Sequence, residues 1–216
     1  MPDTKAVVFI VDDDASVRKA LARVLQNAGF TVETYGSAEE VLRRGNFDGP
    51  GCLILDFQMP GLSGIELQTR LAESGCFLPI IFVSGHSSIP ISVKAMKAGA
   101  IDFLTKPFKN SDLLEAVRIS LKKDAEARAI REEMQRIQHH LDRLTDREKE
   151  VLCWVVGGHL NKQIADELGI SEATVKAHRA HVMEKMQANS LADLVRLVEK
   201  VGIVPAGVPR GTSASK

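Results

Sequence analysis

Four apolar runs in the first half of the chain each end on side chains that could handle a phosphate group. The residues at these ends are Asp12 and Asp13, Asp56, Ser84 and Lys106. An apolar run that stops on a carboxylate and soon breaks at Pro60-Gly61 is typical of a buried parallel strand. The carboxyl ends of parallel strands form the ligand-binding edge of an open α/β sheet. The sequence therefore predicts that these side chains lie together at one edge of one sheet.

Side chains of these types are sufficient for phosphoryl transfer. Clustered carboxylates repel one another unless a cation is present, and Mg²⁺ takes one or two carboxylates together with waters and phosphate oxygens. An aspartate such as Asp56 can act as a phosphoryl-accepting nucleophile. Lys106 and Ser84 could contact the oxygens of the transferred group, because this chemistry needs mainly positioning and charge neutralisation.

The segments between these residues alternate short strands with amphipathic helices. The first helix is expected to begin near Ala15, with Asp14 as its cap, and to end at Gly29. Similar patterns recur as far as residue 122. Five strands and five helices in alternation predict an α/β, doubly wound, five-stranded parallel sheet.

In order and spacing, these residues resemble the receiver domain of two-component response regulators over residues 5–122, which has a flavodoxin-like fold. The motif Met59-Pro60-Gly61-Leu62-Ser63-Gly64 and the segment 96–100 strengthen the resemblance. It implies that Asp56 is the phosphoacceptor, that a sensor histidine kinase is the donor, and that the Lys106–Pro107 bond is often cis. The other implied site residues are Asp12 (through water), Asp13, Asp56 and the backbone carbonyl of Gln58 for Mg²⁺, Ser84 and Phe103 for switching, and Lys106 for the phosphoryl group.

Composition limits the class of protein without identifying a partner. The chain has 216 residues, with Lys+Arg and Asp+Glu both at 28. A neutral net charge is a mild point against nucleic-acid binding, which usually favours a basic domain. There is no membrane-length apolar run and no signal-peptide pattern, so we expect a cytoplasmic protein with no membrane partner. The six histidines form no zinc-binding pattern.

A long helix is expected after the receiver-like segment, since no Gly or Pro occurs between Lys109 and Val156. Residues 123–142 are interpreted as a helical linker. Four of its apolar residues have the spacing of a coiled-coil seam, namely Ile130, Met134, Ile137 and Leu141. We expect this seam to mediate a homodimer; the alternative is a single helix that packs on one domain.

The segment from residue 143 to residue 203 contains the signals of a helix-turn-helix. Thr145 and Glu148 are spaced as a capping box. A short helix from Asn161, a turn at Gly169 and a second helix capped by Ser171 follow. Residues 143–203 resemble the LuxR-type DNA-binding domain of FixJ- and NarL-class regulators, and the long helix and Val83-Ser84-Gly85-His86 favour the FixJ class. Residues 204–216 are expected to be a disordered tail.

The second helix is expected to run from Glu172 to Met186 and to place its N-terminal side chains in the major groove of double-stranded DNA. Lys176 and Arg179 are the best candidates for base contacts. The full set of DNA-contact candidates is Asn161, Lys162, Thr174, Lys176, Ala177, His178, Arg179, Ala180 and His181.

The two resemblances together predict a transcription regulator rather than an enzyme. It would be phosphorylated on Asp56 by a sensor histidine kinase and would be a homodimer at least when phosphorylated. One alternative is a phosphohydrolase that forms an aspartyl-phosphate, although Gln58 stands where that class has a second Asp. The other is a receiver-based interaction protein that does not bind DNA.

Overall fold

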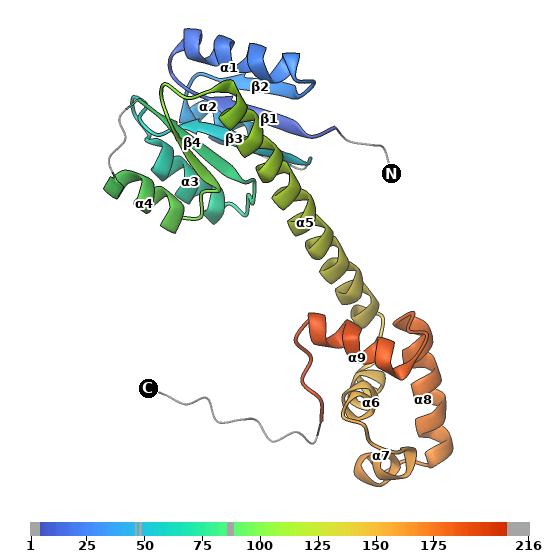
Figure 1. Ribbon diagram of the computed structural model, residues 1–216. Helices are drawn as coiled ribbons and strands as arrows, with labels where there is room; N and C mark the ends of the chain where they lie inside the picture. Colours follow the sequence, from blue (N-terminus) through green and yellow to red (C-terminus); the bar gives the residue numbers. More distant parts are fainter. Residues whose placement is uncertain (1–4, 46, 48, 86–88, 207–216) are drawn as a thin grey trace. The chain divides into compact units, whose positions relative to one another are not determined.

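The computed structural model describes residues 5–206 apart from residues 46, 48 and 86–88. The chain divides into two units, Met1–Ala129 and Ile130–Lys216 (Figure 1).

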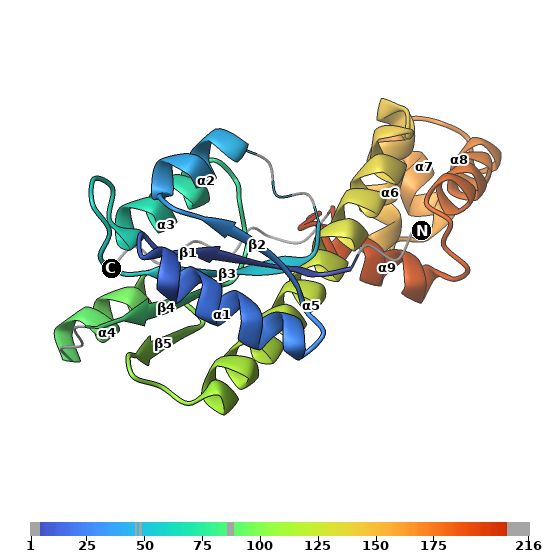
Figure 2. The same cartoon turned by 90° about the horizontal axis from the view of Figure 1, so that it is seen from above.

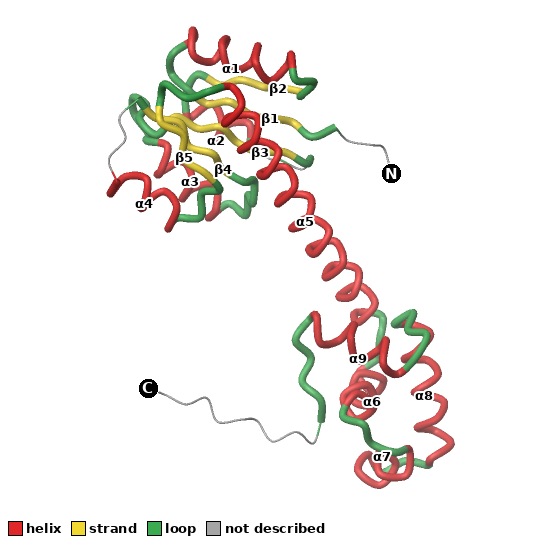
Figure 3. Tube along the Cα trace, in the orientation of Figure 1, coloured by secondary structure: helices red, strands yellow, loops and turns green. Residues whose placement is uncertain are grey.

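The first unit is built on a parallel sheet of five strands, which confirms the predicted fold class (Figure 3). The strands are β1 (Val7–Val11), β2 (Thr31–Tyr35), β3 (Gly51–Asp56), β4 (Ile80–Ser84) and β5 (Asp102–Thr105). Their order in the sheet is β2-β1-β3-β4-β5. From β1 the chain adds β2 on one side of the sheet, and then β3, β4 and β5 on the other side. Ligands of open α/β sheets bind at such a switch point in the strand order. β3 is buried along its whole length, which explains its continuous apolar run.

Helices cover both faces of this sheet, and α1 and α3 lie on opposite sides of it (Figure 2). The helices are α1 (Ala15–Asn27), α2 (Ala38–Arg44), α3 (Gly64–Glu73), α4 (Ile89–Lys97) and α5 (Asn110–Asp142). Leu25 of α1 and Val117 of α5 share one buried cluster with Ile54 of β3. Leu67 of α3 shares the other cluster with Leu55, the next residue of β3. Successive residues of the strand therefore serve opposite layers, as the pleat requires.

Side-chain caps fix the starts of the two helices that follow the acid-bearing strands. Asp14 accepts a hydrogen bond from the Ser16 amide at 2.7 Å and caps α1, as predicted. Ser63 and Glu66 form a capping box at the start of α3, which the sequence analysis missed. These caps limit the movement of the loops that carry Asp13 and the residues after Asp56.

α5 remains attached to the first unit beyond residue 122, where the linker was expected to begin. Asp124 is 1% exposed and accepts hydrogen bonds from the Gly51 amide at 2.9 Å and from Arg128 Nε at 2.8 Å. Arg128 also donates to the carbonyls of Phe47 and Gly49. The charged composition after Lys122 therefore conceals a buried ion pair, and the linker prediction is wrong for these two residues.

The second unit contains the end of α5 and the helices α6 (Asp146–Val156), α7 (Asn161–Leu168), α8 (Glu172–Lys185) and α9 (Leu191–Lys200). α7 and α8 form the predicted helix-turn-helix, with Gly169 at a φ of +64° in the turn, where glycine is favoured. Ser171 caps α8 through the Thr174 amide. Thr145 and Glu148 form the predicted capping box of α6. Apolar side chains from all these helices share one core, including Val151, Ile164, Val175, Val182 and Leu194.

Two of the four residues of the predicted dimer seam are buried in this core, and the other two are exposed. Ile137 and Leu141 are 1% and 6% exposed and pack in the core of the second unit. They are not available to a second chain, so the seam prediction is wrong for both. Short helices need a further apolar surface to complete a core, and the end of α5 provides it. Ile130 and Met134 remain exposed.

The predicted tail begins later than expected. The Ala206 amide donates a hydrogen bond to the Cys153 carbonyl of α6 at 2.9 Å, so the prediction of a disordered tail from residue 204 is wrong up to Ala206. The rest of the predicted tail, residues 207–216, lies outside the described residues.

The buried ion pair of α5 can be tested by removing its cation. Arg128→Ala should lower the free energy of unfolding of the first unit by about 3 kcal/mol, because it leaves the Asp124 carboxylate buried without its cation. Far-UV circular dichroism in urea measures this loss, while Trp154, the single tryptophan, reports on the second unit and should not change. Lys123→Ala on the exposed face of α5 is the control, and an equal loss in the control would contradict the assignment.

Candidate functional site

Two buried carboxylates stand side by side at the C-terminal edge of the sheet. Asp12 follows β1 and Asp56 ends β3, and these strands are neighbours. In each acid, one carboxylate oxygen accepts a hydrogen bond from the backbone amide two residues further on. Asp12 Oδ1 accepts from the Asp14 amide and Asp56 Oδ1 from the Gln58 amide, both at 2.9 Å. The second oxygen of each acid is left for a common partner.

Lys106 is that partner. Its Nζ donates to Asp12 Oδ2 at 2.7 Å and to Asp56 Oδ2 at 2.9 Å. The lysine follows β5, and its peptide bond to Pro107 is cis, as the resemblance implied. The Lys106 amide also donates to the Ser84 carbonyl at 2.8 Å, which joins the ends of β4 and β5. Three of the four predicted strand ends therefore meet through this one side chain.

Burial and charge act in opposite directions on these groups. Burial raises the pKa of Asp56, and the hydrogen bonds from the Gln58 amide and Lys106 oppose this without reversing it. Burial alone would lower the pKa of Lys106, but the hydrogen bonds to Asp12 and Asp56 outweigh it and raise the pKa. The ammonium therefore stays charged, and the pocket contains a cation where two acids would otherwise repel.

The same acids can hold a divalent cation. Asp12, Asp13 and Asp56 each place a carboxylate oxygen within 4.8 Å of the others. Asp13 is exposed while the other two are buried, so the cluster is open to solvent on one side. Hard oxygen ligands with open positions for water fit Mg²⁺. Gln58, the fourth predicted ligand, lies next to this cluster through its amide contact with Asp56.

The two predicted switch residues lie beside the pocket on neighbouring strands. Ser84 is fully buried at the end of β4. Phe103 of β5 is half-buried, with its ring centre 6.0 Å from that of Phe57 and 6.4 Å from that of Phe82. Phe57 directly follows Asp56, so this aromatic cluster connects the acid-bearing loop to β5.

Two further residues support the pocket, and sequence reasoning missed both. Arg18 of α1 donates to the carbonyls of Asp12 and Asp13 at 2.6 and 3.0 Å and so fixes the first loop. Gly64 opens α3 so close to the pocket that a Cβ there would lie 2.4 Å from the Asp56 carbonyl oxygen. The capping-box spacing around Ser63 is the signal that could have indicated this tight turn.

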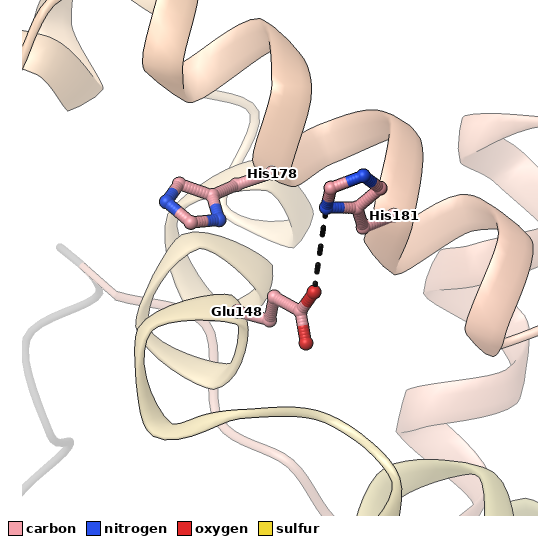
Figure 4. A group of neighbouring side chains, drawn as sticks. All are labelled: Glu148, His178 and His181. Atoms are coloured by element: carbon pink, nitrogen blue, oxygen red, sulfur yellow. Dashed lines mark ion pairs between the residues drawn. The ribbon is translucent and has the colours of Figure 1, made fainter.

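The DNA-contact candidates occupy the helix-turn-helix of the second unit in different environments. Lys162, Thr174, Lys176, Ala177, Ala180 and His181 are exposed, whereas Asn161, His178 and Arg179 are half-buried. Arg179 Nη1 donates to Asn161 Oδ1 at 3.0 Å, which links α8 to the first residue of α7. His178 and His181 lie near Glu148 of α6 (Figure 4).

The first unit has an acidic sheet edge with a buried aspartate, and the second has a helix-turn-helix. This combination defines a class of protein. It is a two-part protein in which one unit carries an acidic pocket suited to a phosphoryl group and the other a helix-turn-helix of the DNA-binding type.

Comparison with known proteins identifies the family. Residues 8–118 match the response regulator receiver domain, and residues 142–198 match the bacterial regulatory proteins of the luxR family. The chain belongs to the response regulators that combine these two domains.

Several relatives match this chain over nearly its whole length. Nodulation protein W of Bradyrhizobium diazoefficiens is 46% identical over 200 residues, covering 93% of this chain and 88% of the relative. Response regulator protein TodT of Pseudomonas putida is 46% identical over 201 residues, with the same coverage of 93% and 88%. Transcriptional regulatory protein FixJ of Rhizobium meliloti is 41% identical, covering 94% of this chain and 100% of the relative.

Solved structures of response regulators also match this chain over most of its length. The response regulator StyR has a TM-score of 0.83 and 49% identity, covering 91% of this chain and 99% of StyR. Full-length FixJ from B. japonicum has a TM-score of 0.56 and 39% identity, covering 92% of this chain and 98% of FixJ. The predicted likeness to the FixJ class is thereby confirmed, although His86, one of the residues quoted for it, lies outside the described residues.

The chain is therefore a phosphorylation-dependent, DNA-binding transcriptional regulator of the two-component type. The family is that of DNA-binding transcriptional regulators, a receiver domain implies a sensor kinase as partner, and receiver domains typically bind Mg²⁺ at their acidic pocket. Within the described part of the chain, no helix has the length and apolarity that a membrane crossing needs.

The tight turn at Gly64 gives a test of how strictly the pocket is positioned. In Gly64→Ala the new Cβ collides with the Asp56 carbonyl, so the loop must shift. The rate of phosphorylation by a small acyl phosphate should fall by about tenfold or more, and the first unit should lose about 1–3 kcal/mol of stability. Gly36→Ala, where a Cβ meets its nearest atoms at an ordinary 3.6 Å, should change neither. A normal rate in Gly64→Ala would show that the turn does not position Asp56.

Proposed function

We propose that Asp56 is the phosphoacceptor of this regulator. The observation that carries the proposal is its position: a buried carboxylate at the end of the central strand, bonded to Lys106 and adjacent to two further acids. A carboxylate oxygen of Asp56 forms a bond to phosphorus while the bond between phosphorus and the histidine nitrogen of the kinase breaks. The electron pair of that bond stays with the imidazole, and no proton is required from Asp56.

Asp12, Asp13, Asp56 and the backbone carbonyl of Gln58 would hold Mg²⁺, with Asp12 acting through a water. The bound ion supplies neutralisation for the charge on the phosphoryl oxygens. Support for this comes from the ligand atoms of the cluster, which are three converging carboxylate oxygens of the hard type that Mg²⁺ prefers.

Lys106 and Ser84 are proposed to change partners when Asp56 is phosphorylated. An ammonium that already contacts Asp56 Oδ2 can transfer its hydrogen bond to a phosphoryl oxygen with little movement. The hydroxyl of Ser84, on the neighbouring strand, would contact another oxygen of the group. Phe103 pairs with Phe82 and Ser84 with Thr105 on the same two strands, so we propose that movement of Ser84 allows Phe103 to turn further inward.

The output is proposed to be a homodimer that presents two α8 helices to double-stranded DNA. Exposed apolar side chains near β5 provide the surface on the first unit, namely Val93 and Met96 of α4 and Ile119 of α5. In the second unit, Ile130 and Met134 also remain exposed on α5 and would offer a separate apolar contact to a second chain. Dimerisation matters because a single helix-turn-helix reads one half-site, whereas two recognition helices bind cooperatively.

The phosphoacceptor is tested with Asp56→Asn and the control Asp102→Asn. With Mg²⁺ and an acyl phosphate, the wild type and the control should each gain one phosphoryl group by intact-mass spectrometry and shift from monomer to dimer by light scattering. Asp56→Asn should do neither, because an amide is not a nucleophile for this reaction. Labelling of Asp56→Asn at the wild-type rate would refute the site, and a phosphorylated wild type that stays monomeric would refute the dimer.

The DNA-binding surface is tested with a duplex that the phosphorylated protein selects from a random library. Lys176→Ala should weaken binding to that duplex by about 1–3 kcal/mol if the lysine reaches a base edge. Arg196→Ala on α9, outside the helix-turn-helix, removes the same charge and should have little effect. Binding measured over a range of salt concentrations should weaken steeply; affinity that is independent of salt, or absent, would instead favour a regulator that acts through protein contacts.

A further inference from the structure

The second unit contains a cluster of potential metal ligands that the DNA-binding role does not explain. Glu148 of α6 and His178 and His181 of α8 each offer a ligand atom, and these atoms all lie within 4.8 Å of one another. The two histidines are three residues apart on one helix, which places them on the same face. The Glu148 carboxylate points from α6 toward the two rings, which both come from α8 (Figure 4).

The carboxylate of Glu148 is buried and held in one orientation. Its side chain is 4% exposed, and Oε2 accepts hydrogen bonds from Lys185 Nζ at 2.6 Å and from the Thr145 amide at 2.8 Å. Oε1 faces His181 Nδ1 at 3.6 Å. Hydrogen bonds that orient a ligand through its other atoms are characteristic of metal sites in proteins.

His178 supplies an independent observation. Its Nδ1 atom is buried and has no hydrogen-bond partner among the described residues. A buried ring nitrogen without a partner is unfavourable, and a bound cation would satisfy it. The side chain of His181 is 58% exposed, so its ring can rotate and the site remains open to ions from solvent.

We propose that Glu148, His178 and His181 bind a divalent transition-metal ion of the Zn²⁺ class. Imidazole ligands favour such ions over Mg²⁺ or Ca²⁺, and two histidines with one glutamate plus water complete a tetrahedral site. Ligand atoms of such a site lie about 3.3 Å apart, given metal–ligand bonds of about 2.0–2.1 Å. The pair Glu148–His181 is already close to this separation, at 3.6 Å, so the remaining adjustment falls mainly on the rings.

Lys185 opposes binding, since its ammonium lies against the same carboxylate. It occupies Oε2, however, and leaves Oε1 to the cation. The repulsion makes the site one of moderate affinity that releases its ion readily. With an ion bound, His178 and His181 are held toward α6 and are not available to a DNA duplex, although both were candidates for DNA contacts.

The test uses the full-length protein, freed of metal with a chelator and kept in excess Mg²⁺ so that the acidic pocket of the first unit does not bind the probe. Co²⁺ is the spectroscopic probe. The wild type should bind one equivalent with the visible absorption bands of tetrahedral Co²⁺, and Zn²⁺ should displace it. His181→Asn and His178→Asn should each weaken Co²⁺ binding at least about tenfold. His139→Asn, an exposed histidine on α5, should bind as the wild type does.

Trp154 fluorescence during thermal unfolding confirms that each variant is folded and gives a second readout. Zn²⁺ should raise the melting temperature of the second unit in the wild type and in His139→Asn but not in the other two variants, because only a native site binds the ion. The proposal is overturned if the wild type binds no Co²⁺, if either His178→Asn or His181→Asn binds as tightly as the wild type, or if the loss occurs in His139→Asn.

Discussion

A single ammonium group holds the acidic edge of the first unit together. Lys106 bonds to both Asp12 and Asp56, and without it two buried carboxylates on adjacent strand ends would be forced together with no cation of the protein between them. The lysine comes from the far side of the sheet, so the bonds reach from the end of β5 past β4 to β3 and β1. Lys106 thus joins Asp56 directly to the end of β5, the strand that carries Phe103. The chemistry at one aspartate is thereby coupled to the shape of the sheet edge.

The second unit also contains a lysine–carboxylate pair, Lys185 with Glu148, and this pair orients helices. Burial alone would raise the pKa of Glu148, but Lys185 and the cap at Thr145 outweigh it and hold the pKa below its usual range. This pair links α6 to α8, and Arg147 adds a hydrogen bond to the Leu168 carbonyl at the end of α7. Small helices have little apolar surface to fix their angles, so charged side chains at the helix ends set the orientation of the helix-turn-helix.

Local chemistry in the sequence was sufficient for most of the fold. Apolar runs ending on Asp12, Asp56, Ser84 and Lys106 located the strand ends, because strand length and burial are local properties. The cap at Asp14 and the capping box at Thr145 were predicted for the same reason. What failed was long-range pairing: a heptad-like pattern cannot reveal that Ile137 and Leu141 face their own chain, and a charged stretch cannot reveal that Asp124 meets Gly51. The grouping of Glu148 with His178 and His181 was likewise invisible, since the glutamate lies on another helix and no metal motif includes that separation.

The strand β3 is fastened at both of its ends. At its start the Gly51 amide is bonded to Asp124, which Arg128 holds in place, and at its end Asp56 is bonded to Lys106. A strand held in this way cannot slide along its own axis without breaking a buried charged contact. The central strand therefore connects α5 to the acidic edge at a fixed register, and a shift of Lys106 at that edge would pass sideways to β5 rather than along β3.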